Sequence, residues 1–404
     1  MISMSIIKPQ SRFVIWIVSV SFVLFQFFLQ LSSGVVIGAI MHNNHLSALI
    51  SGVLSGSFYI VYTGLQIPVG ILFDRKSARL LLATNALICS VGCFIFAASY
   101  GLVGLFLGRM LIGAGSAFAF IGLSHVLRQH YATKQFAFMI GLSETLGFLA
   151  TVIGMIAMGA LVAQWGWRGF INSAGIVGLL ISYLCWTCIP ANAQQLPPPK
   201  SYGQQLLQIL SNGKAWINGI FVGLCFTVVT VFGALWAVPF IQIKLHCSLQ
   251  KASAINAMFF LGTALSCPLF GFLSAQLSKR RPLILGSCLS TAFLFLILLY
   301  IPTQSDALIA FLMFMVGTCC GAYMLAYTIA NELAPVDSLS TCTGFTNMLA
   351  VVTTPLLQPL IGYLLDTFNQ TGIYTLANYQ MALLAIPVSL LIASILVCFL
   401  PETT

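Results

Sequence analysis

The sequence predicts an all-α integral membrane protein with twelve transmembrane helices, arranged as two six-helix halves. Only 6% of its 404 residues are charged and 59% are hydrophobic, whereas soluble domains carry about 25% charged residues. A water-soluble fold could not solvate its surface with so few charges. Two further observations complete the prediction: the number of long apolar runs and a pattern that the two halves share.

Crossing the hydrocarbon core of a bilayer takes about 20 apolar residues in a helix. The first apolar run is too long for the apolar region of a signal peptide and has no small-residue cleavage site, so we interpret it as a membrane helix. In chain order the predicted helices are 13–40, 47–72, 80–99, 101–127, 136–163, 169–189, 215–240, 252–277, 283–302, 307–331, 339–365 and 381–400.

The positions of the basic residues predict the topology. If both termini are cytoplasmic, twelve of the sixteen Lys and Arg residues fall in cytoplasmic segments, three fall outside and one lies within a helix. This distribution obeys the positive-inside rule. The excess of basic residues therefore reports orientation and gives no evidence of a nucleic-acid partner. The cytoplasmic set is Lys8, Arg12, Arg75, Lys76, Arg79, Arg128, Lys134, Lys200, Lys214, Lys279, Arg280 and Arg281.

The longest polar interruption divides the chain in two. Residues 191–214 read "ANAQQLPPPKSYGQQLLQILSNGK", in which three consecutive prolines stop any helix. We predict an N-terminal six-helix half at 1–190, a cytoplasmic linker at 191–214 and a C-terminal six-helix half at 215–404.

The two halves also share a sequence pattern. "LQIPVGILFDRKSARLLL" ends the second predicted helix and "LSCPLFGFLSAQLSKRRPLIL" ends the eighth. Pro68 and Gly70 in the first correspond to Pro268 and Gly271 in the second, and a basic cluster follows each. Two repeated halves are a design of transporters, in which a central site is exposed alternately to either side of the membrane.

The charged loop after the second helix resembles the corresponding loop of the major facilitator superfamily, which carries Gly-x-Leu-x-Asp-Arg-x-Gly-Arg-Arg. The matching residues here are Gly70, Leu72, Asp74, Arg75 and Arg79, while a serine replaces the second glycine. "GRMLIGAGSA" is similar to the family pattern of the fourth helix, and "LPETT" is similar to the Pro-Glu-Thr sequence after the last helix. The resemblance also points to a branch related to the lysosomal dipeptide carrier.

The resemblance implies a conformational gate made of Gly70, Asp74, Arg75 and Arg79. In the family the loop aspartate lies at the N-terminal end of the eleventh helix, which here would begin near 338–341. A carboxylate is stabilised there by the helix dipole and by free N–H groups. The alternative is a loop that obeys the positive-inside rule and does nothing more.

The basic cluster of the second half offers a similar contact. It comprises Lys279, Arg280 and Arg281, and it lacks the acidic residue of the first half. Glu332, at the cytoplasmic end of the tenth helix, could pair with one of these residues or remain solvated.

Two ionisable residues lie within predicted helices of the first half. Ionisable residues inside a membrane are costly and usually face a cavity or a partner. Arg109 in the fourth helix and Glu144 in the fifth lie at similar depths, so they could pair. Glu144 is the candidate proton carrier of a coupled transporter, with Arg109 as its partner. The alternative is an ion pair that orders the two helices.

Amides and phenols fall where a central cavity is expected. Each alone is more often an interhelical hydrogen bond than a ligand contact, but together they favour a moderately polar small solute. The candidate substrate-binding residues are Gln26, Gln30, Tyr59, Tyr62, Asn256, Tyr323, Tyr327 and Asn347.

The predicted function is transport of a small polar metabolite across the bacterial inner membrane, with a dipeptide, an amino acid or an organic anion as candidates. The expected partners are the solute, protons and lipid, and the expected state is a monomer. Efflux of an amphiphilic compound stays open, as does a non-transporting sensor built on a carrier fold. An enzyme is not expected, since the sequence has no phosphate loop and no nucleophile with a partner base. No cofactor or metal ligand set is predicted.

Overall fold

The computed structural model of the chain describes residues 11–31, 33–43, 46–131, 133–191, 207, 210–276, 280–333, 339–369 and 373–402. For a few helical residues, Asp74 and Arg75 among them, it describes the backbone alone. Every regular element within these ranges is a helix. Twelve helical segments are long and apolar enough to cross a membrane, as the hydropathy pattern predicts.

The first half holds six of these segments. The chain turns between the fifth and sixth segments at Gly166, whose φ is +70°. A residue with a Cβ would be strained in this backbone conformation, whereas glycine adopts it readily. The helices are α1 (Arg12–Leu31) and α2 (Ser33–Asn43) in the first segment, then α3 (Ala48–Arg75), α4 (Ala78–Ala98), α5 (Leu102–His130) and α6 (Thr133–Cys188), which forms two segments.

The second half holds the other six segments, and several of them are broken into shorter helices. The seventh comprises α8 (Gly213–Thr227), η1 (Val228–Trp236) and α9 (Ala237–Leu245), and the eighth and ninth are α10 (Leu249–Gln276) and α11 (Arg281–Tyr300). The last three comprise α12 (Asp306–Cys319), η2 (Cys320–Met324) and α13 (Leu325–Leu333), then α14 (Leu339–Val352) and α15 (Thr354–Phe368), then α16 (Leu376–Ala382) and α17 (Ala385–Val397).

The breaks between these shorter helices fall at a proline or at turns that are not α-helical. Pro355 stands at the start of α15, where a proline lacks the N–H that a continuous helix would need. The segment η1 is a π-helix and η2 is a 3₁₀ turn. Such turns inside a longer helix often mark functional positions.

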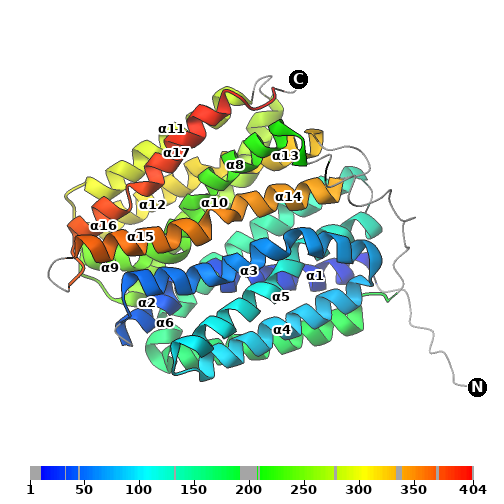
Figure 1. Cartoon of the computed structure of the whole chain (residues 1–404), viewed down its shortest axis with the longest axis horizontal. Helices are drawn as coiled ribbons and strands as arrows, with labels where there is room; N and C mark the ends of the chain where they lie inside the picture. Colours follow the sequence, from blue (N-terminus) through cyan, green and yellow to red (C-terminus); the bar gives the residue numbers. More distant parts are fainter. Residues whose placement is uncertain are drawn as a thin grey trace, which may run out of the picture.

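The two halves lie side by side and meet along several pairs of elements. Figure 1 shows α1 to α6 in blue to green on one side, and α8 to α17 in green to red on the other. Between the halves, α3 packs against α14 and α15, and α6 packs against α10. These contacts surround the centre of the molecule.

The loops lie at the two ends of the bundle. We call the end with the α3–α4 and α5–α6 connections the basic side, because the described residues there include Arg12, Lys76, Arg79 and Arg128. The other end, with the α2–α3 and α15–α16 connections, is called the opposite side. The predicted linker lies largely outside the described residues.

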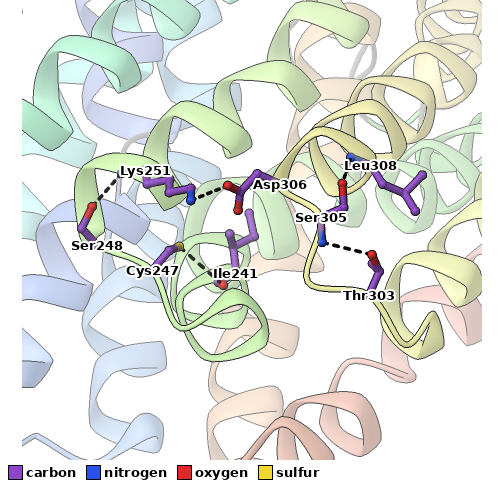
Figure 2. A network of polar contacts seen from close by, with 8 residues as sticks. All are labelled: Ile241, Cys247, Ser248, Lys251, Thr303, Ser305, Asp306 and Leu308. Atoms are coloured by element: carbon purple, nitrogen blue, oxygen red, sulfur yellow. Dashed lines mark hydrogen bonds and ion pairs between the residues drawn. The ribbon is translucent and has the colours of Figure 1, made fainter.

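Ion pairs tie helices together within the second half. On the opposite side Lys251 at the start of α10 pairs with Asp306 at the start of α12, as Figure 2 shows. On the basic side Arg280 donates from Nη1 to both carboxylate oxygens of Glu332, at 2.7 and 2.9 Å. Of the two alternatives that the sequence leaves open for Glu332, the structure shows the ion pair.

Candidate functional site

A cavity of about 120 Å³ lies between the halves at the centre of the bundle. One water needs about 10–15 Å³, so the space admits a small solute. Helices α1, α3, α5 and α6 of the first half and α8, η2, α13 and α14 of the second half line it. Six of the eight predicted binding residues lie in its wall: Gln26, Gln30, Tyr62, Tyr323, Tyr327 and Asn347.

Hydrogen bonds order these polar side chains across the boundary between the halves. The Tyr327 hydroxyl donates to Asn347 Oδ1 at 2.8 Å, and Asn347 Nδ2 donates to Gln66 Oε1 at 2.9 Å. Gln66 is 1% exposed and in turn donates to the Tyr62 carbonyl, at 3.3 Å. This chain of contacts runs from the second half, through Asn347, to α3 of the first half.

A second amide pair lies on α1. Gln26 and Gln30 are four residues apart, which places both on one face of the helix, and Gln26 Nε2 donates to Gln30 Oε1. Gln26 Oε1 is buried and has no hydrogen-bond donor among the residues that the structure describes. A buried amide oxygen without a partner is costly, so a solute that donates a hydrogen bond would complete this site.

The cavity holds one acid and one base. Glu144 projects from α6 and is 8% exposed, and none of the ion pairs among the described residues includes it. Arg128 lines the cavity two residues before α5 ends at His130. The cavity therefore extends from the centre toward the basic side.

Arg109 lies outside this cavity. Its guanidinium donates from Nη1 to the Leu29 carbonyl at 3.0 Å and from Nη2 to the Ser33 hydroxyl. It also stacks on the Phe58 ring, with its carbon 4.9 Å from the ring centre. The described ion pairs do not join Arg109 to Glu144. In this conformation Arg109 holds α1 and α3 against α5.

Two predicted binding residues are not in the cavity wall. Tyr59 is fully buried against the Phe58 ring, with ring centres 5.1 Å apart. Asn256 donates to the Gly233 carbonyl at 2.8 Å and so links α10 to η1. For Asn256 the structure therefore favours the alternative of an interhelical hydrogen bond.

The predicted gate is described only in part. Arg79 Nε donates to the Ile189 carbonyl at 2.6 Å, a contact within the first half. A Cβ on Gly70 would meet no described atom within 4 Å, so this glycine makes no close helix contact in the part of the chain described. The side chains of Asp74 and Arg75 lie outside the described residues.

Sequence reasoning missed Gln66 and Arg128. Gln66 follows Tyr62 by four residues and so lies on the same face of α3. This spacing is the one feature of the sequence that could have placed Gln66 near the cavity. Arg128 shares a face of α5 with Ser124, another lining residue. The positive-inside rule already accounted for Arg128, so its sequence position gave no reason to place it in the site.

Twelve membrane-spanning helices, two halves and a cavity between them, lined by both apolar and polar side chains, define a membrane transporter. The model of the Major Facilitator Superfamily matches residues 16–352 and 220–404. The chain belongs to this superfamily, and it is a transporter rather than an enzyme.

Known relatives match more than four fifths of the chain. The probable galactarate/D-glucarate transporter GarP of Escherichia coli (strain K12) is 21% identical over 387 residues, covering 84% of this chain and 85% of the relative. The hexuronate transporter of Bacillus subtilis (strain 168) is 21% identical over 350 residues, covering 82% of each.

Among solved structures, the fold is similar to that of a bacterial homologue of the human lysosomal transporter Spinster, in its inward-facing and occupied conformation. The TM-score is 0.76 at 17% identity, covering 97% of each chain. This likeness supports the fold, with two six-helix halves around a central cavity.

Proposed function

We propose that this transporter carries a small polar organic anion of the sugar-acid type. The observation that carries the proposal is the composition of the central cavity, where Arg128 supplies a cation and amides and phenols supply further donors and acceptors. Arginine suits carboxylates because its guanidinium can donate two parallel hydrogen bonds. The amides of Gln26, Gln30 and Asn347 suit hydroxyl groups, which donate and accept.

The relatives support the same substrate class. The names of two of them refer to galactarate, D-glucarate and hexuronate transport, and these solutes combine carboxylates with several hydroxyls. Such a solute would use both kinds of group that the cavity offers.

The transport mechanism proposed is alternating access, with protons as the coupling ion. An anion next to an ionised Glu144 would be repelled, so binding would favour the protonated carboxyl. One proton would then accompany the anion through the cavity. We also expect the basic side to face the cytoplasm of a bacterial cell, since basic residues gather there.

A zwitterion is the second candidate, and a specific observation favours it. The cavity holds both Glu144 and Arg128, which could bind the ammonium and the carboxylate of an amino acid or a dipeptide. In that arrangement Glu144 would stay ionised during binding, because an adjacent cation favours the charged form.

A thermal-shift screen of the purified protein separates these candidates. A ligand that binds only the folded state raises the apparent stability, by about 2.7 kcal/mol at 100 times its Kd. We expect sugar acids to raise the melting temperature of the wild type and of Lys214→Gln, an exposed control on the basic side. Arg128→Gln should lose this response. A response to amino acids or dipeptides alone would favour the zwitterion, and one to amphiphiles alone would favour efflux.

A further inference from the structure

On the opposite side, a carboxylate of the second half caps the N-terminus of a helix of the first half. Asp366, in the last turn of α15, accepts a hydrogen bond from the Ala48 N–H to Oδ1 at 3.1 Å and one from the Leu49 N–H to Oδ2 at 2.9 Å. These donors belong to the first turn of α3, whose N–H groups have no partner within the helix. A carboxylate there also meets the positive end of the helix dipole.

A tyrosine completes the contact. Tyr374, in the loop after α15, donates its hydroxyl to Asp366 Oδ1 at 2.6 Å, and the Tyr374 hydroxyl oxygen itself accepts from the Ala48 N–H at 2.9 Å. Burial, together with the hydrogen bond to Asp366, raises the pKa of Tyr374 to about 12. The hydroxyl therefore keeps its proton and remains a donor at neutral pH.

Glycines allow the two helices to come close enough for this contact. A Cβ on Gly362 of α15 would overlap the Ala48 carbonyl oxygen, and one on Gly52 of α3 would overlap the Gln358 carbonyl. Small residues at helix crossings let backbones approach closely in a bilayer. The end of α3 on the basic side differs, since a Cβ on Gly70 would meet no described atom within 4 Å.

We propose that Asp366 is the gating residue of the opposite side, which holds α3 to α15 while the cavity extends toward the basic side. The contact joins the two halves, so it must break when the opposite side opens. A contact made in one conformation and absent from the other shifts the equilibrium between them by its own free energy. This inference rests on the alternating-access mechanism proposed above, but its test requires no substrate.

A reporter for opening can be placed on the same face of α3. Ser55 lies seven residues after Ala48 and seven before Tyr62, so the three share a helix face. Its side chain is fully buried, and its hydroxyl has no hydrogen-bond partner in the described part of the chain. Ser55→Cys is nearly isosteric and would be shielded while Asp366 holds the helices together. The probe is a membrane-impermeant charged thiol reagent, added to intact cells and read out by mass spectrometry of the α3 peptide.

We expect Asp366→Asn and Asp366→Ala to raise the labelling rate of Ser55→Cys about tenfold. Hydrogen bonds to a charged group are stronger than neutral ones, so their loss should increase the population of the open conformation. Asp306→Asn is the matched control, because Asp306 pairs with Lys251 inside the second half (Figure 2) and does not cross the boundary. Its labelling rate should equal that of the parent. Gln304→Cys, exposed in the α11–α12 loop, establishes that the reagent reaches this side.

Two further measurements keep the result unambiguous. Ser90→Cys is buried within the first half, and an equal rise there would mean general loosening and would overturn the proposal. If the Asp366 variants do not fold, Tyr374→Phe weakens the same contact, with Tyr363→Phe on exposed α15 surface as its control. Unchanged labelling of Ser55→Cys in folded variants, with Gln304→Cys labelled, would also overturn it. A failed substrate screen leaves this result untouched, so the two failures are distinguishable.

Discussion

The Asn347 amide of α14 donates to the Gln66 side-chain oxygen of α3 at 2.9 Å, and this bond joins the two halves beside the central cavity. Asn347 lines the cavity, while Gln66 is buried behind it. A solute that hydrogen-bonds Asn347 would therefore act on a contact between the halves. The relationship connects the candidate binding site to the boundary that rearranges in the proposed alternating-access mechanism.

Gln66→Leu removes this bond while keeping most of the side-chain volume. We expect transport to slow and the free energy of unfolding to fall by about 1 kcal/mol, the usual size of an interhelical hydrogen bond. The control is Asn85→Leu, a buried amide whose hydrogen bonds to described residues all lie within α4. Uptake rates and melting curves of both variants check the prediction. If the two variants transport equally well, Gln66 does not couple the halves.

Glu144→Gln mimics the protonated carboxyl in the cavity. We expect exchange of substrate across the membrane to survive and pH-driven accumulation to be lost, because the variant cannot release a proton. Uptake into vesicles with and without an imposed pH gradient measures both. Wild-type uptake that ignores the gradient would mean that another ion, or none, is coupled. Accumulation by Glu144→Gln would place the proton carrier elsewhere.

Arg109→Ala should act on stability instead of coupling. The guanidinium bonds to the Leu29 carbonyl and to Ser33 and is 5% exposed, so its loss leaves buried groups without donors. We expect the free energy of unfolding to fall by about 1–3 kcal/mol. Arg12→Ala, an exposed arginine over the Tyr131 ring, is the control. A normal melting temperature combined with lost pH-driven accumulation would return Arg109 to the coupling role that the sequence suggests.

The Asp74→Asn variant tests the gate on the basic side, which the family resemblance implies. We expect transport to be impaired more than binding, because the gate contact would differ between the two conformations. Ligand binding by thermal shift and uptake by vesicles measure the two effects. Uptake at the wild-type rate by properly inserted protein would show that no latch exists at Asp74.

The sequence predicts some features well because they follow from local chemistry. Apolar runs of this length must cross the bilayer as helices, so the sequence predicts all twelve membrane-spanning segments. Gln26 and Gln30 are found together because a spacing of four places both on one helix face. Such arguments need only one helix at a time.

Other features depend on which helices meet, and a single sequence does not reveal that. Asp366 reads as an ordinary residue at a helix end, and only the packing of α15 on α3 brings it to the Ala48 N–H. One partner of Arg109 is the Leu29 backbone carbonyl, a group that every residue possesses. From the sequence, Asn256 is a candidate ligand residue; in the structure its side chain donates to the Gly233 carbonyl instead.

We propose above that a small organic anion crosses the membrane through this cavity. Counterflow in liposomes loaded with unlabelled galactarate or D-glucarate measures it most directly, by uptake of the labelled anion. We predict transient accumulation above protein-free liposomes for the wild type and for Lys214→Gln, and none for Arg128→Gln. Uptake of neither sugar acid by the wild type, or equal uptake by Arg128→Gln, would show that this cavity does not carry sugar acids through Arg128.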